Sequence, residues 1–257
     1  MGKLLRLRDY ILIAAAAASE VFEDIRLVGG IVPKVMEGTY GFVPAKYRHS
    51  SYSSTVSQML STGDIRKIIN RQGEVQLELT SVGEQQFKRR FKLFLQTHKW
   101  DGLFMMVIFD IAEKNRPARD QFRRKLEELG FGMLQKSVWI SPYHFEDDMR
   151  ESLVNQGLET EVFIFSGRRL LAGDLRLMAS TTWKLSRINE KYQQILHKIN
   201  ESATSPLKNK RILNEAYQEY FTVLASDPLL PRELLPKEWL RSKVITTLNR
   251  LFKIYNR

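Results

Sequence analysis

The 257-residue sequence predicts an α+β protein, and three patterns along the chain indicate that fold class. The first part has apolar residues at helical spacing, then a short polar-faced helix and a basic hairpin. The middle alternates apolar strands with amphipathic helices. The last part is mostly helical and contains a proline-rich connection. We therefore expect three domains, at residues 1–98, 99–172 and 173–257.

The first segment has the order of elements of a winged helix-turn-helix. Residues 5–25 carry apolar side chains at roughly helical spacing, whereas glycines and two prolines interrupt residues 28–48, to which no element is assigned. The stretch HSSYSSTVSQMLSTGD, residues 49–64, predicts a helix that ends at Thr62-Gly63. One face of this helix is apolar, with Tyr52, Val56, Met59 and Leu60, and the opposite face is polar, with Ser54, Ser57, Gln58 and Ser61.

A hairpin and a closing helix follow the polar-faced helix. In IRKIINRQGEVQLELT, residues 65–80, apolar and polar residues alternate from Val75 onward, as in a half-buried strand. Gln72-Gly73 predicts a tight turn between the two strands. Ser81 and Glu84 have the spacing of a capping box, which predicts the start of the closing helix.

These residue types fit duplex DNA. A recognition helix presents short polar side chains to base edges in the major groove, and we expect that role for Ser54, Ser57, Gln58 and Ser61. A wing needs cations for phosphates, which Arg66, Lys67 and Arg71 would supply. The alternative is that a serine-rich face is simply solvated.

The central segment predicts a ferredoxin-like domain of the βαββαβ type. The run LFMMVIFDI, residues 103–111, indicates a strand that is covered on both faces. An amphipathic helix follows, with Pro117 near its start and Gly130 at its end. MLQKSVWISPY, residues 133–143, is interpreted as one further strand. A second helix and a third strand, TEVFIFSG, complete the segment.

A polar triplet interrupts the predicted strand 133–143. Strand alternation would place Gln135 and Ser137 on one face and Lys136 on the other. No base, nucleophile and orienting group converge there. We therefore expect the triplet to lie at a sheet edge or in a contact between two copies.

Aromatic residues in the last segment lie at helical spacing, which is usually a sign of a helical core. The stripe comprises Trp183, Tyr192, Tyr217, Tyr220 and Phe221, and Leu177 precedes it at the same mixed spacing of three and four residues. The functional alternative is that Trp183 or Tyr192 lines an effector pocket.

The charge of the chain favours a polyanionic partner. The net charge is +11, with 40 basic and 29 acidic side chains. Residues 1–99 carry 15 basic and 9 acidic side chains, residues 100–172 carry 10 and 12, and residues 173–257 carry 15 and 8. The two basic ends are therefore expected to meet nucleic acid, and the centre is expected to have another role.

Several classes of site are excluded by composition. The chain has no cysteine, which rules out disulfides and thiolate sites and fits the reducing cytoplasm. Its four histidines show no ligand pair at helical spacing, so a zinc site is not expected. No apolar run reaches the roughly 18–20 residues that a membrane span needs, and we expect no membrane partner.

The chain resembles the PaaX family of transcriptional regulators, which repress phenylacetic acid catabolism and related pathways. Three stretches carry this resemblance across nearly the whole length. They are FDIAEKNRPARDQFRRKLEELGFGMLQKSVWISPY, WKLSRINEKYQQIL and DPLLPRELLPKEW. The resemblance implies a winged helix, a homodimer, operator binding, and release by an acyl- or aryl-coenzyme A thioester.

The centre alone also resembles the small ferredoxin-like CRISPR-associated endoribonucleases. Asp110 at the end of the first strand, the arginine-rich helix and residues 135–139 carry this second resemblance. It implies that Asp110, doubled in a dimer, could bind Mg²⁺ and act in catalysis. One aspartate per chain is a thin ligand set, and a plainer role is ion pairing with Arg116, Arg119 and Arg123.

The sequence thus predicts a homodimeric DNA-binding repressor of the PaaX type that is not an enzyme and needs no cofactor. We expect the central domain, residues 99–172, to join the two copies. The alternative is a divalent-metal-dependent nuclease related to CRISPR adaptation, with Asp110 as its candidate residue.

Overall fold

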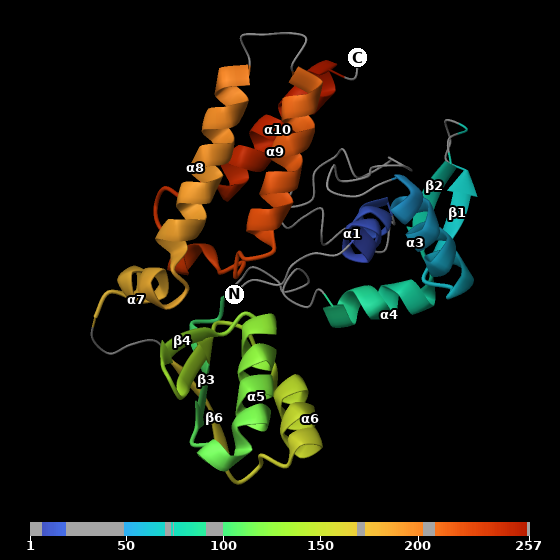
Figure 1. Ribbon diagram of the computed structural model, residues 1–257. Coiled ribbons are helices and arrows are strands. Elements are labelled where there is room, and N and C mark those ends of the chain that lie inside the picture. Colours follow the sequence, from blue (N-terminus) through green and yellow to red (C-terminus); the bar gives the residue numbers. More distant parts are fainter. Residues whose placement is uncertain are drawn as a thin grey trace. The chain divides into compact units, whose positions relative to one another are not determined.

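The computed structural model describes most of the chain as two compact units (Figure 1). The described residues are 7–18, 49–69, 73, 75–90, 100–168, 173–202 and 209–255. The sheet unit comprises Met1–Lys3, Gln96–Ile188 and Ser226–Glu238. The helix–hairpin unit comprises Leu4–Leu95, Asn189–Ala225 and Trp239–Arg257. The division into domains 1–98, 99–172 and 173–257 stays a prediction.

The sheet unit is built on four antiparallel strands in the order β4-β5-β3-β6. These are β3 (Leu103–Phe109), β4 (Gly132–Gln135), β5 (Val138–Ser141) and β6 (Val162–Arg168). Helices α5 (Arg116–Glu128) and α6 (Glu146–Gln156) give the chain the order β-α-β-β-α-β. This order, with the first strand between the third and the fourth, is that of a ferredoxin-like sheet. The predicted α+β class is confirmed.

The core of the sheet unit forms between α5 and the sheet. Phe122 and Leu126 of α5 are completely buried, because they recur on one face of the helix. The Phe122 ring meets the Phe109 ring of β3 edge to face, at 5.4 Å between centroids. Gly130 adopts a φ of 78° where α5 ends, a conformation that glycine reaches without strain.

The prediction of a single strand over residues 133–143 is wrong. The chain forms a hairpin of β4 and β5, and Lys136 and Ser137 make the turn. The polar triplet cannot continue a buried strand, so the chain reverses there and returns Trp139 to a position opposite Val107 of β3. The two-face alternation predicted for Gln135, Lys136 and Ser137 therefore does not exist.

Helix α7 (Leu175–Thr182) follows the sheet, and Trp183 after it packs against β4. The Trp183 indole Nε1 donates to the Gly130 carbonyl at 2.9 Å. A Cβ on Gly132 would lie 2.5 Å from a Trp183 ring atom, so only glycine permits this packing. Leu177, which has the spacing of the apolar residues that follow it, is 67% exposed. Lys184, at a φ of 53°, separates α7 from α8, and Leu177 is therefore out of phase with the apolar stripe of α8.

The last three helices carry an aromatic core in the helix–hairpin unit. They are α8 (Leu185–Ser202), α9 (Asn209–Leu224) and α10 (Arg241–Tyr255). Tyr192 of α8 is fully buried between Tyr220 of α9 and Trp239, with ring centroids 6.0 Å and 5.8 Å away. Burial raises the pKa of Tyr217, so this phenol stays neutral. The aromatic residues at helical spacing thus form core.

Five further elements complete the helix–hairpin unit. They are α1 (Leu7–Ala18), α3 (His49–Ser61), β1 (Ile65–Ile69), β2 (Val75–Leu79) and α4 (Ser81–Arg90). In α1, Tyr10, Ile11, Leu12 and Ile13 are all buried. Residues 28–48 lie outside the described residues, so the complete winged helix-turn-helix remains a prediction. In the part of the chain that the structure describes, no helix is both long and apolar enough to cross a bilayer.

A histidine between two carboxylates links the start of β3 to the start of α6. His144 Nε2 lies 2.9 Å from Asp101 Oδ2, and its Nδ1 lies 3.1 Å from Glu146 Oε1. The hydrogen bond to Asp101 is the main cause that raises the pKa of His144, and that to Glu146 adds to it. Protonated His144 therefore favours the folded sheet unit.

We expect the contribution of His144 to stability to depend on pH. A raised folded-state pKa gives stability that is fully present below the unfolded pKa of about 6.5 and is lost as pH rises through the folded pKa. His144→Ala should therefore lower the melting temperature more at about pH 5.5 than at about pH 8.5. His197→Ala, which removes an exposed histidine of α8, is the control. An equal effect of His144→Ala at both pH values would contradict this linkage.

Candidate nucleic-acid interface

Helix α3 has the two faces that its sequence predicts. Tyr52, Val56 and Met59 are buried, at positions i, i+4 and i+7 of the helix. The opposite face is exposed and polar, with Ser54, Ser57, Gln58 and Ser61. Short side chains on this face leave the helix backbone free to approach a flat or grooved partner closely.

The hydroxyl groups of this face differ in their availability. Ser61 Oγ donates to the Gln58 carbonyl at 2.8 Å, so its proton is used within its own helix. Thr55 Oγ1 donates to the Ser51 carbonyl at 2.7 Å in the same way. The side chains of Ser54, Ser57 and Gln58 have no partner among the described residues. These three can therefore bond to a ligand without first breaking a contact.

The hairpin follows α3 directly and carries two described cations. Arg66 lies opposite Glu78 in the antiparallel register, and its Nε donates to Glu78 Oε2 at 2.6 Å. Lys67 lies opposite Leu77, and its side chain is exposed. Arg71, the third predicted cation, and Gln72 of the predicted turn lie outside the described residues. Arg66 is thus held in place by a partner, so a phosphate would share it with Glu78.

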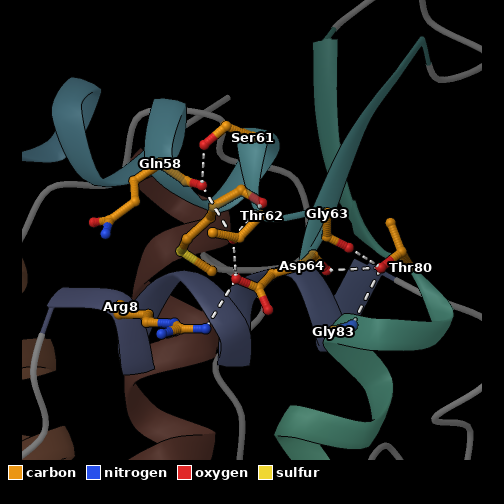
Figure 2. A network of polar contacts seen from close by, with 9 residues as sticks. Arg8, Gln58, Ser61, Thr62, Gly63, Asp64, Thr80 and Gly83 are labelled. Carbon is orange, nitrogen blue, oxygen red and sulfur yellow. Dashed lines mark hydrogen bonds and ion pairs between the residues drawn. The ribbon is translucent and has the colours of Figure 1, made fainter.

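Buried Asp64 joins α1, α3 and the hairpin (Figure 2). Its carboxylate accepts from Arg8 Nη2 of α1 at 2.9 Å and from Thr62 Oγ1 at 2.5 Å. Its backbone N–H donates to the Met59 carbonyl at 2.9 Å, which continues the end of α3. The carboxylate of a single residue therefore fixes the direction in which the chain leaves α3.

Thr80, which follows β2, bonds the other end of the hairpin to Gly63 and Asp64 (Figure 2). Its N–H donates to the Asp64 carbonyl at 3.1 Å, and its hydroxyl donates to the Gly63 carbonyl. The same hydroxyl accepts from the Gly83 N–H at 3.1 Å, which caps α4. A Cβ on Gly83 would lie 1.8 Å from the Asp64 carbonyl oxygen, so only glycine fits. We call Asp64, Thr80 and Gly83, with Arg8 and Thr62, the Asp64 junction.

The predicted capping box of Ser81 and Glu84 is wrong by one residue. Ser81 is the first residue of α4, and Thr80 before it provides the cap. Glu84 instead pairs with Lys88, one turn along the helix. Thr80 was assigned to the strand because it continues the alternation of β2, and the same residue serves both elements.

Asp110 is exposed at the end of β3, and its N–H donates to the Glu161 carbonyl at 3.0 Å. The expected pairing with the arginines of α5 is not formed. Arg119 pairs with Glu113 at 2.7 Å, and Arg123 donates to the Lys136 carbonyl at 2.7 Å. Arg116 lies 3.7 Å from Asp120, one turn along α5. Each of these acceptors lies on α5 or next to it, and the three arginines bond to them instead of to Asp110.

No metal site is evident in the described ranges, which contain no group of three histidine, aspartate or glutamate side chains suited to hold an ion. The carboxylate of Asp110 has no partner there. Binding of Mg²⁺ by Asp110 of two copies stays a prediction.

The two residues of the predicted effector pocket lie in different units. Trp183 belongs to the sheet unit, where its indole bonds to Gly130. Tyr192 belongs to the helix–hairpin unit and is fully buried. Both have structural contacts that explain them, and their role in an effector pocket stays a prediction.

Comparison with known proteins assigns the family. The model of the "PaaX protein central Cas2-like domain" matches residues 97–179, and that of the "PaaX-like protein C-terminal domain" matches residues 183–256. The chain belongs to the PaaX family. This confirms the resemblance drawn from residues 109–143 and from the two stretches that follow.

A curated PaaX relative is the "Transcriptional repressor PaaX" of Escherichia coli (strain K12), which is 28% identical over 152 residues. That match covers 54% of this chain and about half, 48%, of the repressor's own length. Among solved structures, "Uncharacterized protein Rv0674 from Mycobacterium tuberculosis" has a TM-score of 0.52 and 20% identity. It covers 82% of each chain, which shows a shared fold.

The role of Thr80 in the Asp64 junction can be tested by mutation, with its neighbour Ser81 as the matched control. Thr80→Ala removes the cap of α4 and the bond to Gly63, and it should lower the free energy of unfolding by about 1–2 kcal/mol. Ser81→Ala, at an exposed position beside it, should change that free energy by less than about 0.5 kcal/mol. Urea unfolding followed by circular dichroism measures both. Equal effects of the two substitutions would show that Thr80 is not the cap.

Proposed function

We propose that this PaaX-family protein is a DNA-binding transcriptional repressor that acts as a homodimer and blocks a promoter. The observation that carries the proposal is the exposed polar face of α3 beside a cationic hairpin. The repressor named among its relatives supports the same function. The two basic ends of the chain agree with a polyanionic partner.

The polar face of α3 would lie in the major groove. Gln58 can form two hydrogen bonds with an adenine edge, and the hydroxyls of Ser54 and Ser57 can bond to any base. All three side chains are free to do so, whereas the Ser61 hydroxyl would accept rather than donate. The expected interface is thus centred on Ser54, Ser57 and Gln58.

The hairpin would contact the phosphate backbone. Lys67 is exposed and offers an ammonium group to a phosphate. Arg66 has Glu78 as a partner, so its phosphate contact would be offset by the cost of weakening that pair. Lys67, Arg66 and Arg71 all keep the phosphate-contacting role that the sequence predicts for the hairpin.

Two copies at a fixed spacing would place two such helices on one side of the duplex. Bound in this way, the protein would occlude the promoter without chemical action on DNA, and no enzymatic step is proposed. Release by an acyl- or aryl-coenzyme A effector remains a prediction that rests on the family resemblance.

The protein should bind duplex DNA without cutting it. Labelled duplexes selected by the protein from a random pool, and labelled RNA, are incubated with it in Mg²⁺ and in chelator. Retarded and intact DNA in both conditions is the expected result. Fragments that form only with Mg²⁺ and disappear in Asp110→Ala would instead establish the nuclease alternative.

Loss of one phosphate contact should change the salt dependence of binding. Lys67→Ala should make the slope of log K against log salt concentration shallower by about 0.9, because the variant neutralises one phosphate fewer and releases fewer counterions when it binds. Lys136→Ala, in the β4–β5 turn, removes one exposed lysine elsewhere and is the matched control. Fluorescence anisotropy between about 50 and 200 mM salt measures the slopes. Slopes that do not differ between the two variants would remove Lys67 from the interface.

A further inference from the structure

Strand β6 ends the four-stranded sheet, and one of its long sides has no partner among the described residues. It pairs with β3, in the register that places Val162 opposite Phe109 and Arg168 opposite Leu103. A long, exposed edge strand is a template for a further strand unless charges, proline or a bulge protect it. The seven residues of β6 contain no proline, and the strand pairs with β3 in one continuous register without a bulge.

The direction of each backbone group on β6 follows from one hydrogen bond. Asp110 N–H donates to the Glu161 carbonyl, so Glu161 faces β3. In an antiparallel pair, residues alternate between facing the partner strand and facing away. Phe163, Phe165 and Gly167 therefore also bond to β3. The outward N–H and C=O groups belong to Val162, Ile164, Ser166 and Arg168.

Two large aromatic side chains of β6 are exposed next to this edge. Phe163 is 57% exposed and Phe165 is 52% exposed. They alternate with Val162 and Ile164, so they lie on the sheet face opposite to the buried Val107 and Phe109 of β3. Gly167 lies on the same face as the two rings, and an added Cβ there would meet nothing within 4 Å. Exposed rings beside a free edge indicate a docking surface.

We propose that β6 pairs with β6 of a second copy, antiparallel and about a two-fold axis at Phe165, so that two sheets join into one. This register places Val162 opposite Arg168 and Ile164 opposite Ser166, so all four outward residues of each strand gain a partner. On the exposed face it places Phe165 opposite Phe165 and Phe163 opposite Gly167. A residue without a side chain then faces a large ring, and the rings can pack diagonally.

The ends of β6 favour a second copy of this chain as the partner. Glu159 and Glu161 precede the strand, and Arg168 ends it. An antiparallel pair brings the acidic end of one strand beside the basic end of the other, whereas a parallel pair would bring like charges together. Glu161 Oε2 and the Arg168 guanidinium have no partner among the described residues. The charges at the ends of β6 therefore match those of a second β6 only when the two strands run antiparallel.

This inference deepens the proposed function by naming the surface that joins its two copies. Gln135 ends the edge strand β4, and Lys136 and Ser137 form the turn after it, which agrees with the predicted edge position, and their part in a contact between two copies stays a prediction. The pairing of β6 is tested without DNA: a monomer that binds DNA would overturn this inference alone, and a dimer that does not bind DNA would overturn the repressor proposal alone.

The pairing of two β6 strands can be tested by the mass of the protein in solution and by a disulfide cross-link between the two copies. The full-length protein should sediment at twice the chain mass of 30.0 kDa. Because the chain has no cysteine, Phe165→Cys introduces a single thiol, and mild oxidation should convert the protein to a covalent dimer. The facing Cα atoms at a non-hydrogen-bonded position lie about 4.5 Å apart, within disulfide range. Val154→Cys, at a 60% exposed position of α6, should stay monomeric on a denaturing gel.

A proline separates edge pairing from any other mode of association. Ser166→Pro removes an outward N–H and leaves the ladder to β3 intact, so it should yield a folded monomer. Ser166→Ala should remain a dimer. The inference is overturned if the wild-type protein is a monomer, if Phe165→Cys fails to cross-link, or if the Ser166→Pro dimer is as stable as that of the wild type. Should Ser166→Pro not fold, Phe165→Lys, which sets like charges on the axis, gives the same readout.

Discussion

The buried carboxylate of Asp64 is the constraint on which the proposed DNA-binding surface depends. It holds Arg8 of α1 and Thr62 after α3, while its carbonyl receives Thr80 at the end of the hairpin. Removal of one partner from a buried charge costs far more than an exposed ion pair contributes. The polar face of α3 and the cations of β1 therefore keep one relative orientation.

The two units offer different kinds of surface. The helix–hairpin unit offers hydroxyl, amide and ammonium groups at an exposed surface, and its charge draws it to a polyanion. The sheet unit is nearly neutral, and its exposed aromatic residues lie beside an edge that has no partner strand in the described part of the chain. A surface rich in backbone donors and rings is suited to another protein chain rather than to phosphates. Binding of DNA and association of two copies would thus use separate surfaces.

Periodicity along the chain was sufficient for the elements with one apolar face. Its pattern predicts a helix over residues 49–61 with the observed buried and exposed sides, and it predicts α5 with its buried residues and its glycine stop.

Features that depend on contacts between residues far apart in the sequence cannot be predicted from periodicity. The reversal at Lys136 is set by the pairing of β5 with β3, and the cap at Thr80 is set by Gly63 and Asp64. The pairing of Arg66 with Glu78 likewise required the register of the hairpin. The edge position of β6, and with it the exposed Phe163 and Phe165, could be read only from the strand order.

Site-specific photocross-linking can show whether α3 contacts duplex DNA. The absence of cysteine allows one thiol-reactive photoprobe to be attached at Ser57→Cys and, in a separate protein, at Asn155→Cys on the exposed side of α6. We expect a covalent DNA adduct from position 57 and none from position 155, with the adduct lost at high salt. An adduct of equal yield from both positions, or from position 155 alone, would show that α3 does not meet the duplex.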